Sequence, residues 1–251
     1  MKKVISYTLF AAKNPNEYIK GLLAAKELLG ELYPDWTIRV YTCESIDKRI
    51  TDIFEKWNWE VIPVTGHVGS WIGVWWRLLP IWDETVDIVS VGEADTLPTY
   101  TYRKLLNIFE QLDKNVMGRV DVYPHTTTMY GGFLVFKRKG MEKIRSIVSL
   151  EEFHLSAQQA QHIGAEEYWM YNTMYPIIKD DFFDAHVQWQ DGFEGWRDNK
   201  YYTPPIIPPV DSSLIRHNLI KITRNQDGHG PLDNIWSYYS DCDYQPVTLS
   251  K

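Results

Sequence analysis

Strand and helix patterns alternate regularly from residue 4 to residue 91. Runs rich in β-branched and aromatic residues predict strands at 4–10, 36–43, 59–64 and 86–91. Apolar residues at helical spacing between them predict helices at 19–32, 46–57 and 71–82. This order is typical of an open, mainly parallel sheet with helices on both faces, so the sequence predicts an α/β fold.

The second half of the chain continues the pattern less regularly. Helices are predicted at 101–114, 140–149 and 165–176, and strands at 116–122 and 130–136. From residue 182 onward the periodicity degrades, and two Pro-Pro pairs punctuate the sequence. A chain of 251 residues fits one large domain, so we expect a single domain over 1–251 with an irregular C-terminal segment.

Composition narrows the class of function. The formal net charge is −7 and no basic tract occurs, which argues against a broad footprint on nucleic acid. Two cysteines give no disulfide framework, and no apolar run approaches a membrane span. We therefore expect a soluble cytoplasmic protein. Eleven Trp and sixteen Tyr hint at carbohydrate, because sugars pack on aromatic rings, although most such rings belong to a core.

An acidic tip follows the fourth predicted strand. Side chains alternate along an extended chain, so Glu93 and Asp95 point to the same side. Two close carboxylates favour a hard divalent cation such as Mg²⁺ or Mn²⁺ between them. Ligands of open α/β sheets bind beyond the carboxyl ends of the strands, where this pair lies. A solvated turn is the alternative interpretation.

Two further pairs stand out later in the chain. Gly131 and Gly132 open a predicted strand, which allows either a close backbone approach or a β-bulge. Glu166 and Glu167 stand in the first turn of a predicted helix, where capping alone would explain one of them. The chain has no Walker loop and no glycine fingerprint after its first strand. A metal-bridged diphosphate is therefore the alternative to a glycine-rich phosphate site.

In order and type, these parts resemble a small glycosyltransferase of the GT-A fold, including small stand-alone enzymes of viral type. The resemblance spans roughly residues 3–190 and is carried by short motifs: Tyr7–Phe10, Trp75–Pro80, Glu93–Asp95, Gly131–Phe133 and Gly164–Glu167. It implies transfer of a sugar from a nucleoside diphosphate sugar, a uridine one first, to the hydroxyl of a glycan or other acceptor. It also implies Mn²⁺ or Mg²⁺ as cofactor.

The resemblance assigns the metal ligands. Asp95 matches the last residue of the family's Asp-x-Asp motif and would bind the metal directly. Glu93 takes the first position, facing ribose or metal, and departs from the family by being Glu. His186 matches the C-terminal metal ligand of such enzymes best, with His217 and His229 as rivals.

The resemblance also assigns donor and catalytic residues. Thr8 and Phe10 would lie near the base and ribose, and Arg77 near the diphosphate or base. Gly131 and Gly132 would lie under the transferred sugar. The catalytic base would be Glu166 or Glu167, with a slight preference for Glu167. By this resemblance, 1–115 forms the nucleotide-sugar half, 116–190 the acceptor half, and 191–251 a C-terminal segment that acts as a lid.

Three other functions remain open at this stage. The acceptor could be a modified base in phage DNA, although the negative net charge weighs against it, and a viral enzyme would act in the host cytoplasm. The chain could be a non-catalytic module that binds nucleotide sugars or carbohydrate. It could also be a sugar-nucleotide nucleotidyltransferase, but 11–15 is a poor version of that family's loop after the first strand. The oligomeric state is left open.

Overall fold

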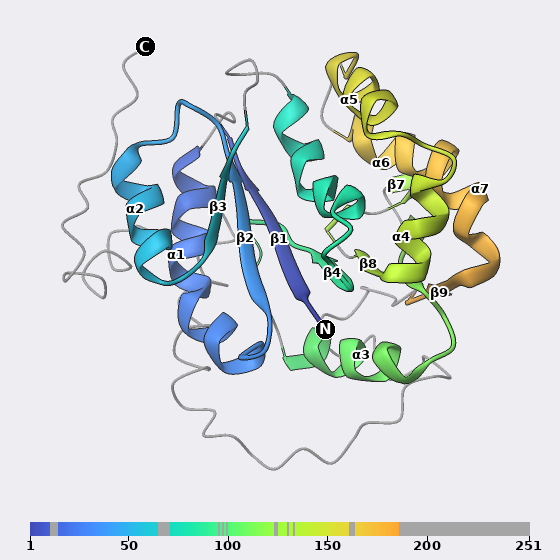
Figure 1. Cartoon of the computed structure of the whole chain (residues 1–251), viewed down its shortest axis with the longest axis horizontal. Helices are drawn as coiled ribbons and strands as arrows, with labels where there is room; N and C mark the ends of the chain where they lie inside the picture. The colour runs from blue at the N-terminus through green and yellow to red at the C-terminus, as the bar shows by residue number, and fades with distance from the viewer. Residues whose placement is uncertain are drawn as a thin grey trace.

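The computed structural model describes residues 1–10, 15–64, 71–94, 96, 98, 100–122, 125–129, 131–132, 134–160 and 164–185. Seven strands form the main sheet in the order β3-β2-β1-β4-β8-β5-β9, and a separate sheet pairs β6 with β7 (Figure 1). The strands are β1 (Lys3–Leu9), β2 (Thr37–Thr42), β3 (Glu60–Pro63), β4 (Ile88–Val91), β5 (Val116–Gly118), β6 (Val120–Val122), β7 (His125–Met129), β8 (Leu134–Lys137) and β9 (Phe182–Asp184).

Strand direction confirms the predicted open, mainly parallel α/β sheet. Strands β3, β2, β1 and β4 are parallel, whereas β8 runs antiparallel to both of its neighbours. The helices are α1 (Pro15–Leu32), α2 (Lys48–Lys56), η1 (Trp71–Trp82), α3 (Tyr100–Gln111), α4 (Arg138–Arg145), α5 (Leu150–Gln158), α6 (Ala165–Trp169), η2 (Met170–Met174), α7 (Tyr175–Ile178) and η3 (Lys179–Asp181).

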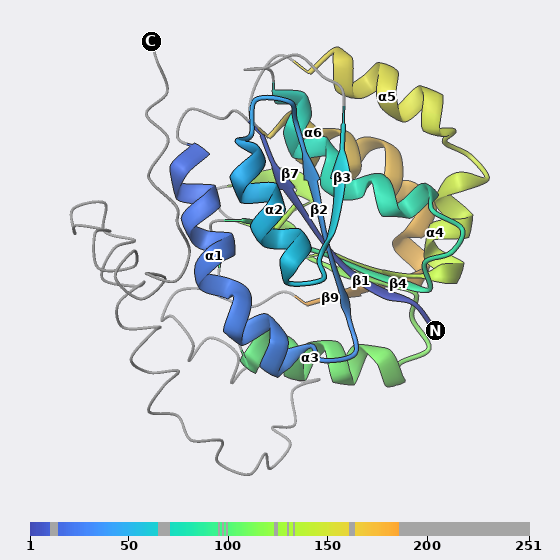
Figure 2. The ribbon, with the colours of Figure 1, turned by 60° about the vertical axis from the view of Figure 1, so that its left-hand side comes forward.

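Two hydrophobic cores cover the two faces of the sheet. Helices α1, α2 and α3 pack on one face, and η1, α4, α5, η2 and α7 pack on the other. Figure 2 shows α1 and α2 on one side of the strands and α4 and α5 on the other. Consecutive strand residues alternate between the cores, with Ile5 in the first and Val4 in the second. Because both faces are covered, every residue of β1 and β4 is buried.

The strand order reverses between β1 and β4. From β1 the chain proceeds outward through α1 to β2 and through α2 to β3. It then returns through η1 to β4, which pairs with the other edge of β1. A crevice outside the carboxyl ends of the strands forms at such a switch point, and ligands of open α/β sheets bind there. The fold therefore points to the ends of β1 and β4.

Several elements differ from the sequence prediction. The strand predicted at 116–122 divides into β5 and β6, which belong to different sheets, and the strand predicted at 130–136 begins only at Leu134. The pattern failed to predict β7, α5 and β9. Strand β9 lies at the edge of the sheet, parallel to β5, in a stretch predicted to be irregular. Three residues are too few for a period-2 pattern, so pairing alone defines this strand.

The helix predicted at 71–82 is a 3₁₀ helix, with Pro80 inside it. It is enclosed on several sides, because Trp75, Trp76, Leu78 and Ile81 are all at most 2% exposed. In a 3₁₀ helix, side chains three residues apart lie above one another, so the row that includes Arg77 differs from that of an α-helix. Arg77 lies outside the row of apolar residues expected for an α-helix here, yet it is only 6% exposed.

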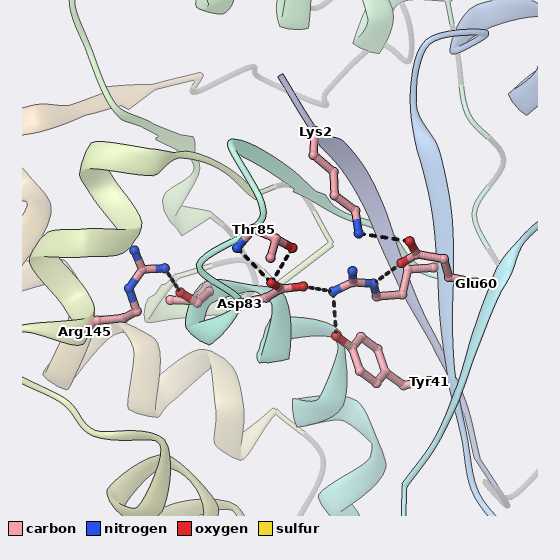
Figure 3. Close-up of polar contacts among 8 residues, drawn as sticks. Lys2, Tyr41, Glu60, Asp83, Thr85 and Arg145 are labelled. Carbon is pink, nitrogen blue, oxygen red and sulfur yellow. Dashed lines mark hydrogen bonds and ion pairs between the residues drawn. The ribbon is translucent and has the colours of Figure 1, made fainter.

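A buried ion network closes the amino end of the sheet. In β2, Arg39 Nε lies 2.6 Å from Glu60 Oε2, and its Nη1 lies 2.8 Å from Asp83 Oδ2 and 3.4 Å from the Tyr41 hydroxyl. Figure 3 shows Tyr41, Glu60 and Asp83 in this network, and Lys2 Nζ also contacts Glu60 Oε1 at 3.0 Å. We call Arg39, Tyr41, Glu60 and Asp83 the amino-end cluster. It ties β2 to β3 and to the end of η1.

Candidate active site

A second charged cluster lies at the opposite end of the sheet, just beyond β4. Glu93 follows the end of that strand by two residues, and its carbonyl accepts a hydrogen bond from the Thr96 N–H at 3.1 Å. This turn presents the Glu93 side chain, about a quarter exposed, at the switch point. Asp95 lies outside the described residues, so its position beside Glu93 stays a prediction.

Arg77 reaches the same place from η1. Its Nη1 lies 3.4 Å from Glu93 Oε1, and its Nη2 lies 3.3 Å from Glu166 Oε1. Its Nε is buried without a hydrogen-bond partner. Charge-assisted hydrogen bonds between a guanidinium and a carboxylate are usually about 2.7–2.9 Å long. These contacts are therefore long for such pairs, and the arginine is shared between two acids without a short bond to either.

The predicted pair of acids lies on α6 and faces inward. Glu166 and Glu167 are 3% and 5% exposed, and the helix begins at Gly164, whose φ of 82° is left-handed and suits glycine. Glu167 Oε1 accepts a hydrogen bond from the Gly131 N–H at 3.0 Å, whereas the buried Glu166 Oε2 has no hydrogen-bond partner among the described residues. Both carboxylates are therefore buried in the protein interior and do not form a solvated cap at the start of the helix.

The glycine pair lies in a turn before β8, in close contact with this cluster. A Cβ on Gly131 would lie 2.6 Å from Arg77 Nη2, and a Cβ on Gly132 would lie 2.4 Å from Glu93 Cδ. Real Cβ atoms do not approach heavy atoms that closely, so only glycine fits at both positions without movement of a neighbour. The close backbone approach predicted from the sequence is therefore an approach to the side chains of the site itself.

We call Arg77, Glu93, Glu166 and Glu167 the carboxyl-end cluster, and its electrostatics are unusual. Burial raises the pKa of Glu166; the guanidinium of Arg77 opposes this rise, while Glu167 and Glu93 add to it. Burial opposes the charge on Arg77, but the carboxylates of Glu93, Glu166 and Glu167 outweigh it and raise the pKa of the arginine. Elevated carboxyl pKa values are what general acid–base chemistry near neutral pH requires.

Thr8 and Phe10 lie at the end of β1, the other strand of the switch point. Thr8 Oγ1 donates a hydrogen bond to the Gly73 carbonyl at 2.7 Å, and Phe10 packs so closely that a Cβ on Gly73 would lie 2.2 Å from its ring. Both side chains therefore hold the start of η1 against the sheet. Their predicted place near a base and ribose stays a prediction.

Three aromatic rings, which the sequence did not single out as a cluster, pack together between the helices that carry the site. Phe153 of α5 lies 5.6 Å, ring centroid to centroid, from both Trp75 and Trp169, and those two rings lie 5.2 Å apart. These rings join α5 to η1 and α6, the two helices that carry the arginine and the glutamates. The sequence held one signal for α5: Ser149 and Glu152 form its capping box.

The donor set for a divalent metal is described only in part. Glu93 supplies a carboxylate, the type of oxygen ligand that Mg²⁺ and Mn²⁺ prefer. His186, His217 and His229, like Asp95, lie outside the described residues. Among the residues that are described, no group of three His, Cys, Asp or Glu is arranged to hold a metal ion. Likewise, none of the described helices is long and apolar enough to cross a membrane.

Comparison with known proteins supports the fold. No family model matches the sequence, and no curated protein matches it. A cytidylyltransferase from Leptospira borgpetersenii aligns with a TM-score of 0.50 and 15% identity, over 98% of each chain. S. aureus TarS aligns with a TM-score of 0.50 and 12% identity, over 74% of this chain and 36% of that one. The chain thus shares an α/β fold of GT-A type with these proteins.

Proposed function

We propose that this chain is a glycosyltransferase that moves a sugar from a nucleoside diphosphate sugar, a uridine one first, to an acceptor hydroxyl. One observation carries the proposal. Glu93 from the tip of β4, Arg77 from η1 and the two glutamates of α6 converge beyond the carboxyl end of the strand at the switch point. This is where a fold of this type binds its ligands.

The glutamates of α6 supply the base. In the proposed reaction a carboxylate takes the proton of the acceptor hydroxyl, whose oxygen bonds to the anomeric carbon as the bond from that carbon to the diphosphate breaks. The raised pKa and the unpartnered Oε2 support Glu166 in this role, although the sequence slightly favoured Glu167. The hydrogen bond that Glu167 accepts from Gly131 fits it for orienting the turn beside the donor.

The charge of the departing nucleoside diphosphate needs a counterion. A divalent cation held by Glu93 and Asp95, with His186 as a further candidate, would offset that charge. Carboxylate oxygens suit Mn²⁺ and Mg²⁺ in type. The remaining parts of the proposal follow the sequence prediction: residues 1–115 bind the donor, residues 116–190 bind the acceptor, and the segment from 191 closes over them.

Thermal unfolding tests donor binding. A ligand that binds only the native state raises the melting temperature, and saturation at about 100 times Kd adds roughly 2.7 kcal/mol to the free energy of unfolding. We expect uridine diphosphate to stabilise the protein with Mn²⁺ and to lose this effect in excess chelator. Equal stabilisation with and without chelator would refute the metal-assisted part. No stabilisation by any nucleoside diphosphate would refute the donor.

A second candidate is a nucleotidyltransferase that joins a nucleotide to a sugar phosphate. The cytidylyltransferase that shares this fold over nearly the whole chain favours it. The two activities differ in their products, because a nucleotidyltransferase releases pyrophosphate from a nucleoside triphosphate. Incubation with cytidine or uridine triphosphate and a sugar phosphate, followed by a pyrophosphate assay, separates them. We expect no pyrophosphate.

A further inference from the structure

The side chain of Arg77 leaves little guanidinium surface for a ligand. It is 7% exposed, and each terminal nitrogen already contacts a carboxylate, Nη1 on the Glu93 side and Nη2 on the Glu166 side. The backbone at Gly131 closes a third side, because a Cβ there would lie 2.6 Å from Nη2. A phosphate oxygen would therefore have to reach the remaining N–H groups past two carboxylates and the backbone of Gly131.

The charges around Arg77 also disfavour an anion. Three carboxylates act on this one guanidinium, those of Glu93, Glu166 and Glu167. Like charges repel, and the repulsion is stronger in a buried site than in water. An approaching diphosphate would therefore meet at least as much repulsion from the acids as attraction from the arginine.

We infer that Arg77 is an internal counterion that positions Glu166 for its role as base, and that it does not bind the phosphates of the donor. This inference rests on the proposed function for the role of Glu166, and it replaces the donor-binding role implied by the resemblance. The guanidinium bridges Glu166 on α6 to Glu93 beyond β4, so it fixes the first acid relative to the strand tip.

The charge of Arg77 also favours the ionised form of Glu166. Without the guanidinium, burial and the neighbouring carboxylates of Glu167 and Glu93 would act on Glu166 against a backbone hydrogen bond alone. Its pKa would rise further, and a base must be ionised to accept a proton. Loss of the arginine should therefore move the acidic limb of the pH–rate profile to higher pH, an effect that simple loss of packing would not produce.

A double-mutant cycle on the ligand-free protein tests the counterion. Arg77→Met removes the positive charge that acts on the carboxylates of Glu93, Glu166 and Glu167, and we expect a lower melting temperature. Adding Glu166→Gln removes one of these charges, so the double variant should recover at least half of the loss. The matched control adds Glu60→Gln, from the amino-end cluster, to Arg77→Met and should recover nothing. Additive losses in both pairs would overturn the inference.

Calorimetric binding of uridine diphosphate with Mn²⁺ tests the role toward phosphate. We compare the wild type, Glu166→Gln and the double variant Arg77→Met/Glu166→Gln. The double variant lacks the Glu166 carboxylate, so it carries one negative charge fewer than Arg77→Met alone. A direct charged hydrogen bond to phosphate would cost roughly 10- to 100-fold in affinity when removed. We expect the double variant to bind within about threefold of Glu166→Gln, a difference of about 0.65 kcal/mol. A tenfold weaker Kd would overturn the inference.

Transfer rates add a readout specific to positioning. Arg77→Lys keeps the charge but cannot bridge two acids with a planar fork. We expect it to restore the acidic limb of the pH–rate profile that Arg77→Met shifts upward, with kcat still below the wild type and KM for the donor nearly unchanged. An unshifted limb in Arg77→Met would contradict the inference. If the wild type binds no nucleotide, the proposed function fails, and the stability cycle alone decides the role of Arg77.

Discussion

Two buried arginines, Arg39 and Arg77, have equally exposed side chains, 7% each, but different surroundings. At the amino end of the sheet, Arg39 makes short contacts of 2.6 and 2.8 Å to two acids that are about one-third exposed. At the carboxyl end, Arg77 makes contacts of 3.3 and 3.4 Å, and one of its partners, Glu166, is almost fully buried. A network of short, hydrogen-bonded ion pairs stabilises a fold. Several carboxylates held around one arginine by long contacts are more typical of a functional site.

The pKa values of the acids in the two clusters shift in opposite directions. Burial opposes ionisation of Glu60 and Asp83, but hydrogen bonds to them, including those from Arg39, outweigh it and lower both pKa values. Burial dominates at Glu166 and raises its pKa despite Arg77. An arginine therefore lowers the pKa of its partners only where its contacts outweigh burial. Under the proposed function, the carboxyl-end cluster would give up stability for activity.

The largest expected effect is on the transfer rate, and it distinguishes an acid that contacts Arg77 from an acid that contacts Arg39. Glu166→Gln removes the proposed base and should lower the transfer rate by roughly 10²- to 10⁴-fold, because that is the usual contribution of general base catalysis. Glu60→Gln removes an acid of similar type from the amino-end cluster and should leave the rate nearly unchanged. Steady-state transfer by the two variants and the wild type checks this. Similar rates for Glu166→Gln and the wild type would move the role to Glu167.

The next largest effect is the loss of stability when the contacts of Arg39 are removed. Arg39→Met breaks a buried network and should lower the free energy of unfolding by about 3 kcal/mol, the low end for such pairs since both acids are partly exposed. Denaturant unfolding measures it, with Arg39→Lys as the control that keeps the charge. Donor binding by the folded variant should be unchanged. A loss below about 1 kcal/mol would mean that the network is no stronger than a surface ion pair.

The glycine turn gives a smaller effect on stability and a selective one on activity. Gly131→Ala and Gly132→Ala push on the ends of flexible side chains, so each should cost only about 1–3 kcal/mol of stability. Displacing those groups by about 1 Å should nevertheless lower transfer by up to roughly 100-fold.

The chain offers a matched control for the glycine turn. Gly30 lies in α1 with nothing within 4 Å of its Cβ position, so Gly30→Ala should stabilise the helix by about 0.5–1 kcal/mol at full activity. Unfolding and transfer are measured on all three variants. Full activity of Gly131→Ala would show that the turn does not hold the site.

The smallest effect is the pH dependence of stability. Glu60 and Asp83 have lowered pKa values in the folded protein, so their contribution is present above the ordinary carboxyl pKa of about 4 and is lost as the pH falls below it. Glu166 has a raised pKa, so the folded protein loses stability as the pH rises through that value. Melting curves between pH 4 and 8 should show Glu166→Gln gaining on the wild type as the pH rises. A gain that grows toward low pH would contradict this sign.

The sequence predicted the strands of the switch point well because their residues are informative on their own. The apolar run of β4 is typical of a strand buried on both faces of a sheet, and the β-branched and aromatic residues of β1 also indicate a strand, so both patterns have a local cause. The acid after β4, the glycine pair and the glutamates of α6 were singled out for similar reasons, since buried charge and missing side chains need an explanation. The structure brings these three signals together.

The environment of Arg77 could not be read from the sequence. Its burial depends on the 3₁₀ geometry of η1 and on a turn 54 residues later that only glycine allows. The contact between Arg77 and Glu166 spans 89 residues and depends on the aromatic rings of α5, a helix whose weak periodicity gave no warning. Such contacts depend on tertiary packing, which local patterns do not encode.

One measurement tests the central claim most directly: the release of uridine diphosphate from a panel of uridine diphosphate sugars by the wild-type chain. It is followed over time with Mn²⁺ and with excess chelator, because slow transfer to water reports turnover even when the acceptor is absent. We expect metal-dependent release of uridine diphosphate from at least one sugar of the panel. No release from any of them, in a preparation that melts cooperatively, would contradict the assignment of the carboxyl-end cluster as a sugar-transfer site.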